Sequence, residues 1–220
     1  MHVAVWTRPD ISNSTQKLSR VLACPTQNDL DAAYRILDYL AGSQDLQIVF
    51  TAAATPLVES FCDSDYASDP NSMPPRRSTS GSVIFMAGGP IMWSSKTQPT
   101  VAGSTMEAEY MAGNITAKDA LWMRHLLPEL GLPLAGPLEI QCDNVATIAL
   151  IKNPMCTSKA KHIDIIHHFV RERVESGQLS FKFVSWEDNV ADLFTKPLAW
   201  PAFQVHRNRL LQHAQAPAPT

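Results

Sequence analysis

The first part of the chain carries a helical pattern of apolar residues. Asn28 and Asp31 stand at the spacing of a capping box, which predicts a helix that begins near this point. Gly42 ends the pattern, and the apolar run over 46–51 predicts a short strand. We therefore predict a small, mostly helical N-terminal appendage over residues 1–54. The apolar positions at helical intervals are Leu30, Ala33, Ile36, Leu37 and Leu40.

From residue 57 the pattern alternates between strands and helices. The run Ala87-Gly88-Gly89-Pro90 between two apolar segments is a hairpin signal. Strands followed by helices predict an α/β domain, which we place over 57–213. The Ala- and Pro-rich tail over 214–220 is predicted to be disordered. Strands are predicted over 57–63, 82–86, 91–95, 137–142 and 179–185, and helices over 105–130, 145–152, 163–176, 189–196 and 202–212.

Composition limits what such a chain can do. It has 220 residues, of which 45% are hydrophobic, enough for one medium domain with a core and a small appendage. No apolar run reaches the roughly 18 residues of a membrane span, and no secretory signal is recognisable, so we expect no membrane partner. The four cysteines form no CxxC pair, and we expect them to be buried in a protein of a reducing, intracellular compartment, either a cytoplasmic particle or the nucleus.

The net charge of −3 does not favour a chain that binds nucleic acid over its whole surface. Charge is unevenly distributed, however. Between Lys152 and Arg173 the basic residues outnumber the acids, and histidines accompany them. We therefore predict a local basic patch in this range on which a polynucleotide could lie.

Carboxylates follow the predicted strands. Asp63 and Asp143 end strands, Glu109 lies in the long helix, and Asp192 lies in a helix after the last strand. Strand ends of an α/β sheet converge, so these side chains can gather, and they would repel one another unless cations bridged them. Their hard oxygens suit two Mg²⁺ or Mn²⁺ ions, which can activate a water for phosphodiester cleavage. From spacing alone each acid is equally compatible with a turn or a helix cap.

The same acids lie in stretches that closely resemble the ribonuclease H (RNase H) region of copia-type retrotransposon polyproteins. Upstream, Thr7-Arg-Pro-Asp-Ile11 and the segment from Ala32-Ala33 to Leu40-Ala-Gly42 resemble the end of the reverse transcriptase of that family. The resemblance covers nearly the whole chain except the tail. The RNase H stretches are Asp63-Ser-Asp-Tyr-Ala-Ser-Asp69, Arg76-Arg-Ser-Thr-Ser-Gly81, Trp93-Ser-Ser-Lys96, Ser104-Thr-Met-Glu-Ala-Glu-Tyr110, Cys142-Asp-Asn144, Lys161-His-Ile-Asp164 with His168-Phe-Val-Arg171, and Ala191-Asp-Leu-Phe-Thr-Lys-Pro197.

The resemblance implies an RNase H-like fold, a mixed five-stranded sheet flanked by helices. It implies that 1–54 is the C-terminal remnant of a reverse transcriptase, similar to a thumb or connection region. It also implies a metal-dependent endonuclease that cuts the RNA strand of RNA–DNA hybrids with two Mg²⁺ or Mn²⁺ ions. The partners would be the hybrid and the rest of the polyprotein, including reverse transcriptase and integrase. The residues matching the family's catalytic and metal-binding acids are Asp63, Glu109, Asp143 and Asp192.

Two assignments among these acids require a choice. Asp63 and Asp65 lie on the same face of a strand, and the family's pattern favours Asp63 as the first acid. Glu107 stands at capping-box spacing after Ser104, which gives it a structural role, so Glu109 is the better match to the family's glutamate.

Nucleic-acid contacts are predicted around these acids. Trp93 and Trp122 are expected in the core rather than as base-stacking platforms. In the loop before the last acid, cellular RNases H often carry a histidine, whereas this chain has Trp186-Glu-Asp-Asn189, which predicts a slower enzyme or one helped by another group. The predicted nucleic-acid-binding residues are Arg76, Arg77, Lys96, Asn144, Lys159, Lys161 and His162.

A second hypothesis is a catalytically inactive retroelement fragment that binds nucleic acid or tethers a polymerase. The chain holds no Tyr-x-Asp-Asp polymerase motif and begins within what resembles the reverse transcriptase, so it has the features of a fragment. The presence of all four matching acids favours the active nuclease.

Overall fold

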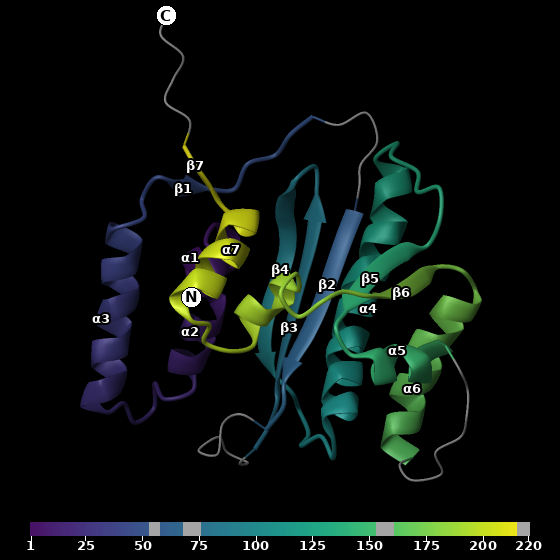
Figure 1. Cartoon of the computed structure of the whole chain (residues 1–220), viewed down its shortest axis with the longest axis horizontal. Coiled ribbons are helices and arrows are strands. Elements are labelled where there is room, and N and C mark those ends of the chain that lie inside the picture. The colour runs from purple at the N-terminus through teal and green to yellow at the C-terminus, as the bar shows by residue number, and fades with distance from the viewer. Residues whose placement is uncertain (53–57, 68–75, 153–160, 215–220) are drawn as a thin grey trace, which may run out of the picture.

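The computed structural model describes residues 1–52, 58–67, 76–152 and 161–214, with 161–167 described by their backbone. Figure 1 shows a central sheet with α1, α2, α3 and α7 on one side and α4, α5 and α6 on the other. The helices are α1 (His2–Trp6), η1 (Pro9–Ile11), α2 (Ser12–Ser19), α3 (Gln27–Ala41), α4 (Thr105–Glu129), α5 (Val145–Lys152), α6 (Lys161–Glu175), η2 (Val190–Phe194) and α7 (Trp200–Leu210), where η denotes a 3₁₀ helix. The strands are β1 (Leu46–Gln47), β2 (Val58–Asp65), β3 (Thr79–Met86), β4 (Gly89–Thr97), β5 (Leu138–Cys142), β6 (Leu179–Phe183) and β7 (Gln212–His213).

The main sheet has five strands in the order β4-β3-β2-β5-β6. Strands β2, β3 and β4 form an antiparallel meander, and β5 and β6 run parallel to β2. This mixed sheet flanked by helices, with a helical segment before it, confirms the predicted fold class. Strand β3 begins at Thr79, earlier than the predicted residue 82, because a buried polar stretch rather than an apolar one opens it.

Each face of the sheet has its own apolar core. One core joins β2, β3, β5 and β6 to α4 and α5, through residues such as Cys62, Tyr110 and Ile140. The other joins β2 and β3 to η2 and the end of α7, through residues such as Phe61 and Phe194. Side chains alternate between the faces along β2. Odd-numbered residues at its end therefore face η2, and even-numbered ones face α4.

The segment before residue 53 packs against the sheet edge. The Trp93 indole N–H on β4 donates to the Ala4 carbonyl at 2.8 Å. The Asn13 amide donates to the Phe194 carbonyl at 3.0 Å, and Gln16 donates to the Thr97 hydroxyl at 2.7 Å. Strand β1 also pairs with β7 near the other end of the chain. The appendage therefore contacts both β4 and η2, and the division near residue 54 stays a prediction.

Several local expectations need correction. Helix α3 is capped by Thr26 with Asp29, two residues before the predicted pair, because this pair makes both reciprocal hydrogen bonds. The strand expected over 46–51 is reduced to the two residues of β1. Trp122 is 54% exposed and so lies outside the core, and Cys24 is exposed, whereas Cys62 and Cys142 are buried as expected. Within the described residues, no helix has the length and apolarity that crossing a membrane requires.

Removal of residues 1–54 tests the domain division. We expect residues 55–220 to keep the sheet but to unfold about 10 °C lower. The loss of three interface hydrogen bonds is worth about 1 kcal/mol each, and 1 kcal/mol corresponds to roughly 2–4 °C in a domain of this size. Circular dichroism and thermal unfolding of both chains measure this. An unchanged midpoint would mean that the segment contributes nothing, and the absence of a cooperative transition would place the domain boundary elsewhere.

Candidate active site

The four predicted acids meet at the ends of β2 and β5. Three of them, Asp63, Asp143 and Asp192, offer carboxylate oxygens that all lie within 4.8 Å of one another. Asp143 also belongs to a second group, in which it lies within the same distance of Glu109 and the Cys142 thiol. Asp143 therefore links the two groups into one acidic cluster, which we define as Asp63, Glu109, Asp143 and Asp192.

Asp63 enters the cluster from the η2 face of β2. It is 2% exposed and accepts a hydrogen bond from the Thr195 hydroxyl, just beyond η2. Asp65, the alternative first acid, belongs to neither carboxylate group among the described residues. The geometry therefore favours Asp63 over Asp65.

Glu109 enters from the opposite face, on α4. One carboxylate oxygen, Oε1, accepts hydrogen bonds from the Ser64 amide at 3.1 Å and the Ser64 hydroxyl at 2.9 Å. Glu107 has a local role instead, since its amide donates to the Ser104 hydroxyl and its Oε2 accepts from the Gly103 amide at 2.7 Å. The helix start thus occupies Glu107 and leaves Glu109 directed at the strand ends.

Close approach of η2 to β3 brings Asp192 into the cluster. A Cβ atom on Gly81 would lie 2.7 Å from the Ala191 carbonyl oxygen and 2.7 Å from Thr195 Cγ2. Only glycine therefore allows η2 to pack this tightly on the strand. Asn189 fixes the entry to η2, because its amide donates to the Cys62 carbonyl at 3.0 Å and its side-chain oxygen accepts from the Ala191 amide.

Crowding of negative charge raises the carboxyl pKa values. Burial, with the nearby Asp63 charge, raises the pKa of Glu109 to about 10 and that of Asp192 to about 7. The pKa of Asp143 is also raised, first by burial and then by Asp63. The Lys196 ammonium opposes the shift at Asp192, where it lies 2.9 Å from Oδ2. The cluster therefore carries more negative charge than its own surroundings neutralise.

These residues fit a divalent cation. Oδ1 of Asp192 is buried and has no hydrogen-bond partner within the described part of the chain. An uncompensated buried carboxylate oxygen is destabilising unless a cation or donor meets it. Carboxylate oxygens are the ligands that Mg²⁺ and Mn²⁺ prefer. The donor set, its burial and the unpartnered oxygen all match the predicted metal site.

The predicted nucleic-acid contacts are more dispersed. Arg76 is exposed, with a positive φ of 62°, and Arg77 is half-buried. Lys96 is exposed on β4, and Asn144 uses its side-chain oxygen to cap α5 by accepting from the Thr147 amide at 2.9 Å. Lys159 and the side chains of Lys161 and His162 lie outside the described residues. The predicted patch between 152 and 173 therefore stays a prediction.

Sequence reasoning missed four residues that touch the acids. Ser64 and Thr195 donate to Glu109 and Asp63, Lys196 pairs with Asp192, and Cys142 lies 4.0 Å from Glu109 Oε2. All four fall inside the stretches that carried the family resemblance. Lys196 had a further signal, because it stands four residues after Asp192, the spacing of ion pairs on a helix.

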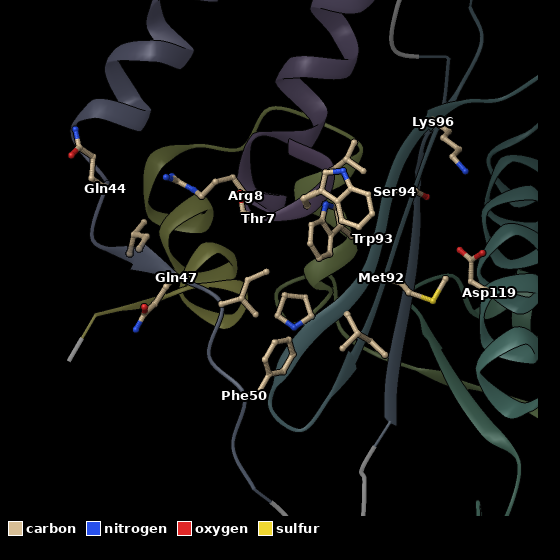
Figure 2. Close-up of a pocket in the computed structure, with 16 residues that line it drawn as sticks. Thr7, Arg8, Gln44, Gln47, Phe50, Met92, Trp93, Ser94, Lys96 and Asp119 are labelled. Atoms are coloured by element: carbon tan, nitrogen blue, oxygen red, sulfur yellow. The ribbon is translucent and has the colours of Figure 1, made fainter. Parts of the chain in front are cut away.

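A cavity of about 780 Å³ lies away from the acidic cluster. Its walls come from the N-terminal segment, from 44–50 and from β4, with Lys96 and Asp119 at one end (Figure 2). None of the four acids lines it. The cavity is therefore a feature of the appendage interface rather than of the acidic cluster.

The raised pKa values predict how stability depends on pH without metal. Asp192 holds its proton in the folded state up to about pH 7 and Glu109 up to about pH 10, whereas the unfolded chain releases both near pH 4. Proton release thus favours unfolding, and we expect the unfolding midpoint in EDTA to fall from pH 5 to pH 9. Asp192→Asn should remove the part of this fall below about pH 7 and unfold at a higher temperature than the unmodified chain at pH 8.

Thermal scans in EDTA across this pH range measure both effects. Repeating the scans with Mg²⁺ should flatten the decline, since a bound cation favours the ionised carboxylates. A midpoint that rises with pH in EDTA, or an Asp192→Asn variant with the same decline, would contradict the described electrostatics.

Comparisons with known proteins complete the description of the site. No family model matches the chain. The chain is 41% identical to the retrovirus-related Pol polyprotein from transposon RE1 of Arabidopsis thaliana over 199 residues, covering 90% of this chain and 13% of the polyprotein. It is 35% identical to the Pol polyprotein from transposon TNT 1-94 of Nicotiana tabacum over 214 residues, covering 97% of this chain and 16% of that one. It is also 38% identical over 123 residues to secreted RxLR effector protein 161 of Plasmopara viticola, covering 56% of this chain and 84% of the effector. The structure of LC11-RNase H1 matches with a TM-score of 0.47 at 17% identity, over 63% of this chain and 91% of that chain. The chain therefore spans only a small part of the two polyproteins.

Proposed function

Because this chain belongs to the retrovirus-related Pol polyproteins of copia-type retrotransposons, we propose that it is their metal-dependent ribonuclease, which hydrolyses the RNA strand of RNA–DNA hybrids. The region has an RNase H-like fold. The observation that carries the proposal is the gathering of Asp63, Glu109, Asp143 and Asp192 at the strand ends. Four buried or half-buried carboxylates with raised pKa values are unusual except where cations are bound.

The acids would hold the metal, and the residues around them would hold the acids. Bound Mg²⁺ or Mn²⁺ would lower the pKa of a water and stabilise the leaving oxygen of the phosphodiester. Ser64 fixes Glu109 by two hydrogen bonds, and Thr195 fixes Asp63 by one. These contacts restrict the rotamers of the acids, so little reordering is needed when a cation arrives. We propose two ions, as the family resemblance implies.

The chain's other groups are poor nucleophiles for this reaction. Cys142 is fully buried and Ser64 already donates its hydroxyl proton to Glu109. Water is therefore the proposed nucleophile. Selection for RNA would depend on the 2′-hydroxyl, and binding on phosphate contacts from the basic residues named above. Binding should weaken steeply with salt and depend little on base sequence.

A cleavage assay tests this function. The intact chain is incubated with an end-labelled RNA–DNA hybrid, double-stranded RNA or double-stranded DNA, each with Mg²⁺, Mn²⁺ or EDTA. We expect RNA fragments only from the hybrid and only with metal. Equal cleavage in EDTA would contradict metal-dependent hydrolysis, and cleavage of DNA would contradict the proposed substrate.

The second candidate is an inactive module that binds nucleic acid or tethers a polymerase. Its support is the way the N-terminal segment reaches the sheet, since Asn13 bonds directly to the backbone of η2. Such a contact could join a preceding polymerase region to this domain. A folded chain that binds the hybrid in a filter assay but cleaves nothing with either metal would favour this function.

A further inference from the structure

Lys196 lies within the acidic cluster itself. Its ammonium is 2.9 Å from Asp192 Oδ2 and 3.9 Å from Asp63 Oδ2. Both carboxylates are nearly inaccessible, whereas the lysine side chain is 37% exposed. The lysine therefore reaches inward from a partly solvated position and places its charge between two buried acids.

No other basic side chain in the described part of the chain forms an ion pair with Asp63 or Asp192. Without a metal, this single positive charge is what balances the acids on the η2 side of the cluster. A divalent cation bridging Asp63, Asp143 and Asp192 would need the same carboxylates. Two cations this close repel each other strongly, because burial weakens solvent screening.

We propose that Lys196 is a built-in counter-ion that competes with divalent metal for Asp63 and Asp192. The proposal rests on the proposed metal site. In the metal-free protein the ammonium stabilises the acids, and metal binding requires it to move away. Its flexible, partly exposed side chain permits this movement. Lys196 thus weakens metal affinity in exchange for a stable fold before metal arrives.

The test measures metal affinity directly, without substrate. Mn²⁺ binding by calorimetry and unfolding in EDTA are compared for the intact chain, Lys196→Gln and Lys196→Arg. We expect Lys196→Gln to bind Mn²⁺ about tenfold more tightly, the order expected when one repulsive charge is removed from a half-buried site, and to unfold at a lower temperature in EDTA. Lys196→Arg keeps the charge and should restore both properties toward those of the intact chain.

A matched control is Lys182→Gln. Lys182 pairs with Glu139 at 3.3 Å, but both side chains are exposed and lie away from the cluster. This variant should change neither property. Circular dichroism confirms that each variant is folded at the temperature of the measurement.

Equal or weaker Mn²⁺ binding by folded Lys196→Gln would overturn the proposal and would mean that Lys196 only orients Asp192. Absence of binding in all variants would also overturn it. A parallel hybrid-cleavage arm separates this inference from the proposed function. Metal-dependent cleavage with unchanged affinity in Lys196→Gln would reject the counter-ion alone. Tighter binding in that variant without cleavage by any chain would support the counter-ion and reject the nuclease.

Discussion

Asp143→Asn is expected to lower the rate of RNA cleavage at least about a hundredfold while the fold is retained, a loss comparable to removal of one transition-state stabilising group. Asparagine has nearly the same shape as aspartate and keeps most of its hydrogen bonding. The substitution removes one negative charge from the residue that links both carboxylate groups. Loss of this charge weakens metal binding on both sides of the cluster.

The measurement is initial cleavage of a labelled hybrid at saturating Mg²⁺, together with the shift of the unfolding midpoint caused by Mg²⁺. Glu129→Gln, at the exposed end of α4, serves as the control and should leave both unchanged. Full activity of folded Asp143→Asn would reject the four-acid mechanism. Removal of one of two repelling carboxylates should also make the metal-free variant more stable, which separates a catalytic defect from misfolding.

Gly81→Ala is expected to impair both stability and cleavage, although Gly81 carries no chemistry. The added methyl group would lie 2.7 Å from the Ala191 carbonyl and 2.9 Å from Phe194 Cβ, so η2 must shift away from β3. Overpacking of this kind costs about 1–3 kcal/mol. Because η2 carries Asp192 and leads into Thr195 and Lys196, its displacement should separate these groups from Asp63 and lower activity by roughly a hundredfold, since small misplacements of reacting groups are costly.

Urea unfolding and hybrid cleavage at a temperature where the variant is folded measure these effects. Gly136→Ala is the matched control, because nothing lies within 4 Å of a Cβ at that position. Unchanged stability and activity in Gly81→Ala would show that η2 tolerates a looser position than the structure indicates.

Much of the fold could be predicted from the sequence because periodicity and turn signals are local. The hairpin at Ala87-Gly88-Gly89-Pro90 lies where β3 meets β4, with positive φ at Ala87 and Gly88. The long helix and the order of strands also follow the apolar pattern. Polar stretches gave no such signal. The start of β3 is buried by pairing with β4 and by Gln98, whose amide donates to the Ser80 hydroxyl, and apolar periodicity does not register such contacts.

The acids themselves could be named from the family resemblance, but their environment could not. The contacts of Glu109 with Ser64, and of Asp63 with Thr195, join residues far apart in the chain and depend on how two layers meet at one sheet end. The exposure of Trp122 likewise depends on which side of α4 faces the sheet. A helical stripe wide enough to include Trp122 does not specify that side.

The pairing of β1 with β7 also has a consequence for synthesis of the protein. Leu46 pairs with His213 and Gln47 with Gln212, so the first and last elements of the described fold meet each other. A nascent chain emerges from the ribosome in sequence order, and the early segment must wait for the final residues before this ladder can form. The sheet meander over 58–97 can form while the later helices are still being made, since its contacts are local. We infer that the N-terminal helices attach late, and that a stalled chain exposes Trp93 and the β4 edge to other chains.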